Sequence, residues 1–364
     1  MPPLPPPEPR EKLESVPPDP WTPSPIDRAR RWLRTHGRKL WWLHSTYALG
    51  LGVGVVLFAR RGFEHARWLG ASASAAWLLA VVLFRAFGSG KKQELLHRSG
   101  PKARLPFYAV TYALKNLYQG MLFFLVPFAW QSTTLLSKNG WFVLVVGACA
   151  VLSTLDIVFD RVVFKYRSFA ALLHAVALFG CVVLAVPAFF PGAHALTALL
   201  LAAGVMVVGF FSLHIRWDKD GARWALALAP ATALAVLAAY LLRGAIPAVP
   251  AHLAHGAVGT APDEQGRLAV EASVVRAAAL NELVCVTRVG MAPGDRLVHV
   301  WRRDDAVMHR EQEGPRVTLA DGTTLVRSAL AGSAIPADTI GRWTVDVETE
   351  DGQLVGRVGF AVEP

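Results

Sequence analysis

The chain has 364 residues, of which 53% are hydrophobic and 18% are charged, and its formal net charge is +10. Such a composition is unusual for a soluble protein of this length and predicts a membrane protein. Most of the positive charge lies in short segments beside apolar runs, and no duplex-reading motif accompanies it, so nucleic acid is excluded as a partner.

The first 39 residues are predicted to lie in the cytoplasm. The segment from Pro2 to Pro25 is rich in proline and would not bury enough apolar surface to fold. From Ile26 to Lys39, arginines combine with Trp32 and Leu33, which favours an interfacial helix beside anionic lipid head groups. No apolar stretch typical of a cleaved signal peptide precedes the first apolar run, so we expect this run to remain as an anchor.

Residues 40–242 contain seven apolar runs, each about long enough to cross a bilayer. A hydrocarbon core of about 30 Å requires about 20 helical residues. Lipid offers no partner for backbone N–H and C=O groups, and the runs lack the alternation of a barrel, so helices are expected. The predicted fold is an all-α membrane bundle of about seven transmembrane helices. The runs are Leu40 to Ala59, Trp68 to Phe84, Leu117 to Thr134, Trp141 to Val158, Phe169 to Phe190, Ala195 to Leu213 and Trp224 to Leu242.

Lysine and arginine beside these runs predict the orientation, because positive side chains are retained on the cytoplasmic side. With the N-terminus inside, eighteen Lys and Arg residues flank the runs on the inside and five on the outside. An odd number of crossings then places the C-terminus outside. The expected location is the bacterial inner (cytoplasmic) membrane, with a periplasmic or extracellular C-terminal domain.

Two groups of polar residues interrupt the apolar runs and form a candidate intramembrane site. The first comprises Lys115, Asn116 and Gln119, and the second comprises Asp156, Asp160 and Arg161. Ionisable groups in hydrocarbon cost about 2.5 to 3.5 kcal/mol, so they are retained for a reason. We favour a Lys115 that lies at the cytoplasmic boundary, where its stem can snorkel, because the third run begins near Leu117. An ion pair between Lys115 and Asp156 would fix helix packing; the alternative is a proton or ion pathway.

Other features of the helical part carry less information about function. His44, His174 and His214 are isolated in sequence and are interpreted as interfacial or packed side chains. Glycine, alanine and serine are frequent in the first, second and seventh runs. Small residues allow close helix packing, which would serve a compact bundle and a homo-oligomer equally well.

Residues 281–364 have the pattern of a β domain, after a predicted linker over residues 243–280. Short alternating segments are separated by turn residues, and Asp321-Gly322 and Asp351-Gly352 are typical of tight hairpins. About seven strands predict an all-β immunoglobulin-like sandwich. They are Leu283 to Val289, Arg296 to Arg302, Ala306 to His309, Arg316 to Leu319, Thr324 to Ala329, Arg342 to Glu348 and Leu354 to Val362.

Several short motifs in this region resemble the bacterial Domain of Unknown Function 2914. They are His299-Val300-Trp301, the Arg327-Ser328 step, and Gly341 to Asp346 followed by Asp351-Gly352 and Phe360. The resemblance covers roughly Asn281 to Pro364 and implies a β domain that follows an uncharacterised membrane region. It departs at Leu325 to Ala329, where aliphatic residues replace an expected aromatic one. The resemblance implies no catalytic residues.

His299, Trp301, Arg327 and Trp343 form the candidate surface of the β domain, although the two tryptophans favour a core position. Two histidines without a clustered carboxylate or thiolate do not indicate a metal site. No cofactor fingerprint, phosphate loop or nucleophile elbow is present. We therefore expect a non-enzymatic protein in which a helical anchor presents a small β-sandwich to a protein or glycan of the cell envelope. The alternative is a transporter or membrane enzyme that uses the polar residues of the third and fourth runs.

Overall fold

The computed structural model describes residues 25–59, 62–88, 101–134, 137–155, 159–163, 165–214, 217–262, 268–277, 280, 282–291, 294, 296–311 and 316–364. Contacts divide the chain into two units, Met1–Tyr47 and Ala48–Pro364. The second unit contains the helices and sheets that matter for function, and the description below concerns that unit.

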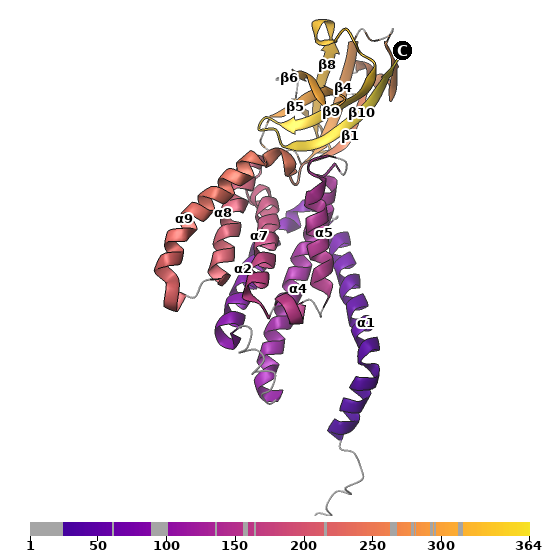
Figure 1. Cartoon of the computed structure of the whole chain (residues 1–364). Coiled ribbons are helices and arrows are strands. Elements are labelled where there is room, and N and C mark those ends of the chain that lie inside the picture. The colour runs from indigo at the N-terminus through magenta and orange to yellow at the C-terminus, as the bar shows by residue number, and fades with distance from the viewer. Residues whose placement is uncertain are drawn as a thin grey trace, which may run out of the picture. The chain divides into compact units, whose positions relative to one another are not determined.

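Seven α-helices are present in the described residues (Figure 1), so the predicted number of helices is confirmed. Three stretches are long and apolar enough to cross a membrane, namely His65–Phe87, Arg167–Phe189 and Ala195–His214. The helices are α1 (Pro25–Ala59), α2 (Trp68–Val82), α4 (Pro101–Gln131), α5 (Gly140–Thr154), α7 (Arg167–Phe189), α8 (Ala195–His214) and α9 (Trp217–Leu241), with short turns η1 (Phe63–Arg67), η2 (Leu83–Phe87), η3 (Phe159–Val163) and η4 (Arg243–Ala245).

The helix α4 differs from the prediction for the third apolar run. It is continuous from Pro101 to Gln131 and contains both Pro106 and Pro127. Lys115 therefore follows 14 helical residues, or about 21 Å of helix. Its side chain is buried, with only 5% exposed. The interpretation of Lys115 as a snorkelling residue at the start of a helix is therefore corrected: the side chain lies inside the bundle.

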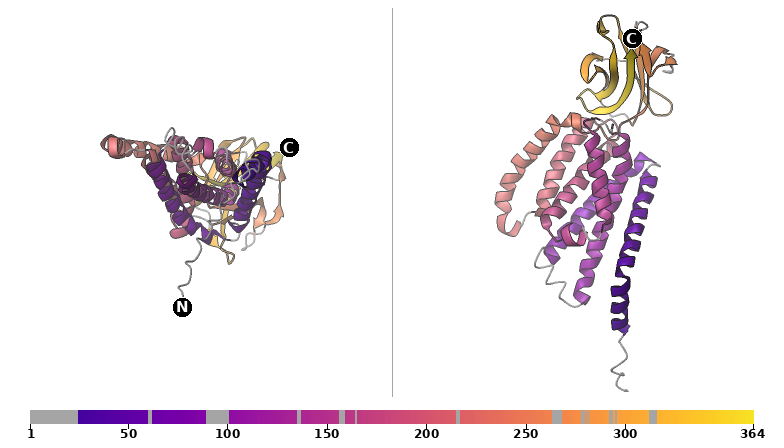
Figure 2. Two further views of the ribbon diagram at one scale, coloured as in Figure 1. Left: turned by 90° about the horizontal axis from the view of Figure 1, so that it is seen from below. Right: turned by 45° about the vertical axis from the view of Figure 1, so that its right-hand side comes forward.

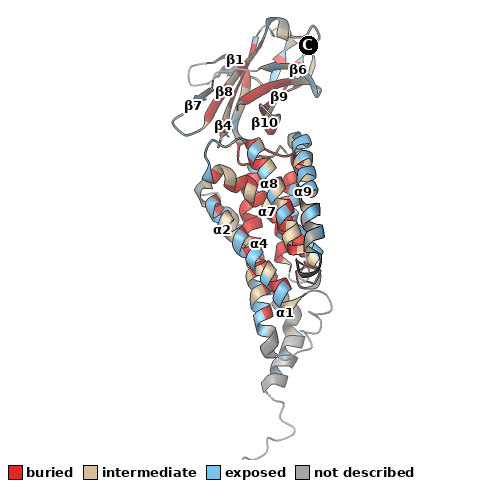
Figure 3. Cartoon of the chain, turned by 90° about the vertical axis from the view of Figure 1, so that its left-hand side faces the viewer, coloured by how far each residue is buried: buried red, intermediate tan, exposed pale blue. Residues whose placement is uncertain are grey.

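Helix packing leaves large apolar side chains on the outside of the bundle. Leu122 and Leu184 are fully buried, whereas Leu78, Leu144 and Leu172 are more than half exposed. Figure 3 shows exposed residues along α2 and α4 beside buried residues on the faces that meet other helices. A soluble protein rarely exposes such extended apolar surface.

Two arginine contacts show how α2 and α7 run past each other. Arg67 Nε donates to the Ala188 carbonyl oxygen at 3.0 Å, beside the end of α7. At the opposite end, Arg167 Nη2 lies 3.5 Å from the Phe84 carbonyl oxygen. The start of α2 thus meets the end of α7, so the two helices are antiparallel, as expected for consecutive crossings in opposite directions.

The C-terminal part contains ten strands in two five-stranded sheets (Figure 2). The first sheet has the order β2-β1-β4-β8-β7 and the second β3-β10-β9-β5-β6. The strands are β1 (His252–Pro262), β2 (Leu268–Glu271), β3 (Val274–Arg276), β4 (Glu282–Gly290), β5 (Leu297–Arg303), β6 (Ala306–Glu311), β7 (Arg316–Thr318), β8 (Thr324–Ala331), β9 (Gly341–Thr349) and β10 (Leu354–Glu363).

Seven of these strands, β4 to β10, confirm the segments predicted from sequence. Gly322 and Gly352 have φ angles of 80° and 85° in the two predicted hairpin turns. Such angles favour glycine, because a Cβ atom is disfavoured in this region. The hairpins β7–β8 and β9–β10 are antiparallel, as predicted.

The predicted linker over residues 243–280 is corrected, because it contains strands β1 to β3. Strand β1 lies between β2 and β4 and pairs with β4 from His252 to Gly259. Strand β3 pairs in parallel with β10, which places it in the other sheet. The abundance of Ala, Gly and His in this segment hid the strands, since β-branched residues are few. The β domain therefore begins about 30 residues before the predicted boundary.

The first residues after α9 and the loop before α5 contact each other and the β domain. Trp141 Nε1 donates to the Ala245 carbonyl oxygen at 2.8 Å. Arg243 Nε donates to the Asp351 carbonyl oxygen at 2.5 Å. Ala195, at the start of α8, packs in one apolar cluster with Val289 and Val347 of the β domain. These contacts replace the flexible tether expected from a linker.

Candidate functional site

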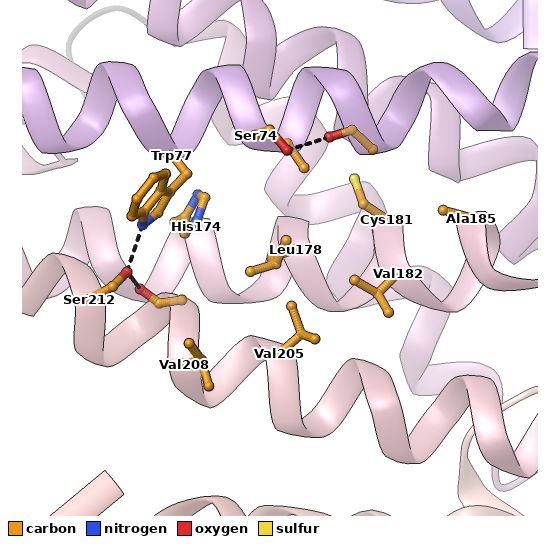
Figure 4. A pocket seen from close by; sticks show the side chains of 13 residues that line it. Ser74, Trp77, His174, Leu178, Cys181, Val182, Ala185, Val205, Val208 and Ser212 are labelled. Atoms are coloured by element: carbon orange, nitrogen blue, oxygen red, sulfur yellow. Dashed lines mark hydrogen bonds between the residues drawn. The ribbon is translucent and has the colours of Figure 1, made fainter. Parts of the chain in front are cut away.

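The largest pocket of the helical part lies between α2, α7 and α8 (Figure 4) and has a volume of about 370 Å³. Its lining is mostly apolar. On α7 it follows His174, Leu178, Cys181 and Ala185, which are spaced by three or four residues and so share one helical face. Pockets that hold small molecules usually have volumes of about 300 to 1,000 Å³. The pocket is therefore large enough for a ligand.

His174 lies at one end of the pocket and is held by Tyr118 of α4. The Tyr118 hydroxyl oxygen lies 2.9 Å from His174 Nδ1, and both side chains are fully buried. A tyrosine hydroxyl has one proton to donate, and Nδ1 is the acceptor that the structure offers it. A neutral His174 then carries its own proton on Nε2. This nitrogen has no hydrogen-bond partner among the described residues, so it is a buried donor.

Trp77 and Ser212 form a second polar contact at the same end of the pocket. Trp77 Nε1 donates to Ser212 Oγ at 2.8 Å, and Ser212 Oγ donates to the Gly209 carbonyl oxygen at 2.8 Å. Figure 4 shows Trp77, Ser212 and His174 together, away from Cys181 and Ala185. The pocket thus has one polar end and one apolar end.

Gly209 allows α7 and α8 to approach closely beside this polar end. A Cβ atom at Gly209 would lie 2.5 Å from Leu178 Cδ2 and 3.6 Å from His174 Nε2. The first distance is too short for a real contact, so the absence of a side chain at Gly209 sets the position of Leu178 in the pocket wall.

The structure separates the residues of the predicted intramembrane site. Gln119 is buried, and its Nε2 atom donates to the Ala48 carbonyl oxygen of α1, while its Oε1 atom has no hydrogen-bond partner among the described residues. Asn116 donates to the Tyr112 carbonyl oxygen of its own helix at 2.8 Å. It lines a smaller pocket of about 200 Å³ together with His65 and Trp68.

The second predicted group, at the end of α5, cannot be compared with Lys115. Asp156 lies outside the described residues, and the side chains of Asp160 and Arg161, in η3, are not described either. The ion pair between Lys115 and Asp156 stays a prediction. Among the described residues, no group of three or more His, Cys, Asp or Glu side chains is arranged to hold a metal ion.

The candidate surface of the β domain is corrected, because three of its four residues are in the core. His299, Trp301 and Trp343 are each at most 1% exposed, and Arg327 is half-buried. Trp343 stacks on Phe360 with the ring centroids 6.0 Å apart. These residues support the packing of the two sheets and do not present an aromatic platform.

His299 connects the two sheets through hydroxyl groups. Its Nε2 atom lies 2.8 Å from Thr287 Oγ1, and its Nδ1 atom lies 2.7 Å from Ser328 Oγ, both from the other sheet. Trp301 Nε1 also donates to Ser328 Oγ at 3.1 Å. Burial lowers the pKa of His299 to about 4, so the ring is neutral near pH 7. A serine beside a histidine can act as a nucleophile, but this pair has no room for a substrate.

Ionic contacts cover the outer face of the second sheet. The Asp346 carboxylate accepts from Arg302 Nε at 2.9 Å and from Arg357 Nε at 2.6 Å. Arg302 also donates to Glu348 at 2.9 Å, and Arg310 Nη2 lies 3.9 Å from the same carboxylate. The hydrogen bond to Asp346 raises the pKa of Arg357. This face is a set of fixed charges, with the guanidinium groups partly exposed.

Sequence reasoning missed the pair of Tyr118 and His174 and the pocket. The two residues are 56 positions apart, and nothing in either apolar run points to the other. One signal was present: the spacing of His174, Leu178, Cys181 and Ala185 marks a single helix face. That face alone does not show which helices leave a space beside it.

Seven helices with three long apolar stretches, joined to a β domain of two packed sheets, define the class of this protein: a helical bundle with a C-terminal β domain. The chain belongs to a family of unknown function (DUF5924), whose family model matches residues 24–283. A second model, for a protein of unknown function (DUF2914), matches residues 294–362 and confirms the resemblance noted from the sequence. No curated protein and no solved structure matches the chain.

The limits of the two family matches add one structural fact. The first match ends at residue 283, inside β4, and so includes β1, β2 and β3. The second begins at residue 294 and covers β5 to β10. The two-sheet domain is therefore assembled from both family regions.

Proposed function

We propose that this protein is an integral protein of the bacterial inner membrane. In this proposal the helical bundle is an anchor, and the β domain binds a protein or glycan on the outer side of the membrane. The observation that carries the proposal is the outer surface of the helices, where Leu78, Leu144 and Leu172 remain more than half exposed. A bilayer would cover these side chains, whereas water would not favour their exposure.

The sidedness of the proposal rests on the distribution of Lys and Arg and is supported by the contacts between loops. The Asn139 and Trp141 segment, which precedes α5, contacts Leu354 and Ala245 respectively. Both the loop and the β domain are expected outside. Contacts between them agree with that expectation, because one membrane face must hold both.

The outer face of the second sheet is the surface that we assign to the partner. The aromatic residues first considered for this role are buried, whereas Arg302 and Arg357 remain about one quarter exposed on that face. Their hydrogen bonds to Asp346 hold them in fixed positions, so little side-chain entropy is lost when a partner binds. Guanidinium groups held in this way suit carboxylate or hydroxyl groups of an acidic protein segment or a glycan.

Alkaline phosphatase fused after Pro364 tests the location of the β domain. Active phosphatase is expected, because the enzyme requires export to fold with its disulfides. A fluorescent protein fused at the same position is the matched control and should be dark. Affinity capture through the β domain from intact membranes, with Arg310→Ala as a variant, then tests the partner surface: recovery of the same partner in equal amount with both chains contradicts the assignment.

A transporter or membrane enzyme is the second candidate, because Lys115 and Gln119 are buried inside the bundle. Buried polar groups at such positions often mark a pathway. The substitutions Lys115→Ala and Asp156→Ala separate the two functions. Reduced abundance of the protein with otherwise normal cell physiology favours the anchor, whereas normal abundance with loss of a transport or enzymatic phenotype favours a pathway.

A further inference from the structure

We propose that the pocket between α2, α7 and α8 binds one acyl chain of a membrane glycerolipid, whose ester carbonyl accepts a hydrogen bond from His174 Nε2. This inference rests on the proposed location of the helices in a membrane. It adds to that proposal a ligand site with a defined lipid chemistry.

The length of the pocket fits an acyl chain in one leaflet. The lining residues on α7 extend from His174 to Ala185, which are 11 residues apart, or about 16 Å along the helix. One leaflet contributes about half of a hydrocarbon core of about 30 Å. A chain that lies along α7 can therefore fill the pocket without leaving its own leaflet.

The order of polar and apolar residues along the pocket matches the order of groups in a glycerolipid. The donor at His174 lies seven residues from Arg167, the first residue of α7, which places it about 10 Å from that end of the helix. The opposite end is lined by Cys181, Val182 and Ala185. A carbonyl oxygen belongs at the first end and a hydrocarbon tail at the second.

The buried donor is the feature that distinguishes a ligand site from ordinary packing. His174 is 1% exposed, and its Nε2 atom lacks a hydrogen-bond partner among the described residues. A buried donor without an acceptor is unfavourable, so a ligand that supplies one restores the lost interaction. Lipid hydrocarbon alone supplies none, whereas an ester carbonyl does.

Residues at the edge of the pocket provide the route from the bilayer. Trp77, Val205 and Val208 line the pocket and are 42%, 38% and 49% exposed. Side chains that face both the pocket and the outside of the bundle allow a chain to enter laterally. This exposure favours a lipid of the surrounding bilayer over a ligand that arrives through water.

The test uses the full-length protein in nanodiscs that contain a phosphatidylcholine with a diazirine in one acyl chain. After irradiation, digestion and mass spectrometry locate the labelled residues. The expected result is preferential labelling of pocket residues such as Leu178 and Val182, compared with the exposed Leu172 of the same helix. A free fatty acid that carries the same diazirine is the second arm, and it is expected to label the pocket less than the phospholipid.

Two variants and a matched control sharpen the test. Val208→Trp fills the pocket from its edge and should reduce labelling of the pocket at least fivefold. Leu201→Trp, at an equally exposed position of α8 outside the pocket lining, should leave it unchanged. His174→Phe keeps a ring but removes the donor, so it should weaken pocket labelling by about fivefold, the order expected for one hydrogen bond.

Three results would overturn the proposal: equal labelling of Leu178 and Leu172, unchanged labelling in both Val208→Trp and His174→Phe, or pocket labelling by the fatty acid alone. A failure of the membrane location has a different signature. In that case alkaline carbonate would release the protein from membranes, and Leu172 and Leu201 would also remain unlabelled.

Discussion

The pH dependence of the β domain follows from the buried His299. Its pKa is about 4 in the folded domain, compared with 6.5 for an ordinary histidine, because burial disfavours the charged ring. Between pH 6.5 and pH 4 the unfolded chain therefore binds a proton that the folded domain does not. Stability falls as the pH decreases through this window and is retained above it.

The size of the effect comes from the difference between the two pKa values. At about 1.4 kcal/mol per pKa unit, the difference between 6.5 and about 4 corresponds to about 3 kcal/mol. His299 is only 1% exposed, so solvent screening does not reduce this value appreciably. A change of this size raises the population of the unfolded β domain on the order of 100-fold.

Cys285 provides an assay that reports the β domain alone. Its thiol is 0% exposed in β4, and burial raises its pKa, so it reacts with a thiol reagent only when the domain opens. The labelled fraction of the Cys285 peptide, measured by mass spectrometry and divided by the rate for the denatured chain at the same pH, gives the opening equilibrium. Dipyridyl disulfides are suitable because they react with thiols in acid.

The control is His299→Gln, whose amide can still contact Thr287 and Ser328 but cannot take up a proton near pH 5. The wild-type chain should lose about 3 kcal/mol more than this variant between pH 6.5 and pH 4. Equal pH slopes for the two chains would refute the reasoning.

Three further predictions concern other parts of the structure. Asp346→Asn should destabilise the β domain by about 3 kcal/mol in the same Cys285 assay, because Arg302 and Arg357 lose a buried carboxylate; Asp338→Asn, which removes an ion pair at a 75% exposed carboxylate, should cost less than about 0.5 kcal/mol, and equal effects would contradict the burial argument. Gly209→Ala should lower the thermal stability of the detergent-solubilised protein by about 1 to 3 kcal/mol, because the new methyl group meets Leu178 at 2.5 Å; Gly204→Ala, with its nearest atom at 3.7 Å, is the control and should have no such effect. A fragment of residues 246–364 should fold, as judged by dispersed amide signals, whereas residues 281–364 should not, because the shorter fragment lacks β1 between β2 and β4; a folded shorter fragment would show that β1 is dispensable.

The helices could be predicted from sequence because long apolar runs have few alternatives. Each of the seven predicted runs corresponds to a helix, and α7 and α8 agree with their runs within a few residues. The start of α4 was missed by 16 residues, since its first half is polar enough to resemble a loop and contains Pro106. Tertiary contacts determine that α4 continues through this segment, and local composition does not show them.

The β domain could be predicted where strands alternate and turns contain Asp-Gly. It could not be predicted over β1, where His252 to Pro262 reads as a linker of small residues. The alternation in β9 was also only half informative. Trp343, Val345 and Val347 face the core as expected, but Asp346 and Glu348 are also nearly buried, because arginines from β5 and β10 cover them. Pairs between distant strands are not visible in one sequence.

The candidate sites show the same limit more strongly. The polar residues of α4 could be identified because they interrupt an apolar run, yet their partners lie on other helices, as Gln119 and Ala48 show. His299 and the two tryptophans could be singled out as unusual residues, but whether they faced solvent or the core depended on the second sheet.

Protease treatment of intact spheroplasts tests the central claim most directly, namely that the helices cross a membrane and hold the β domain on its outer side. With an epitope after Pro364, external protease should remove the epitope from intact spheroplasts while a cytoplasmic marker survives. An epitope that is protected until the membrane is opened, and is then lost, would contradict the account.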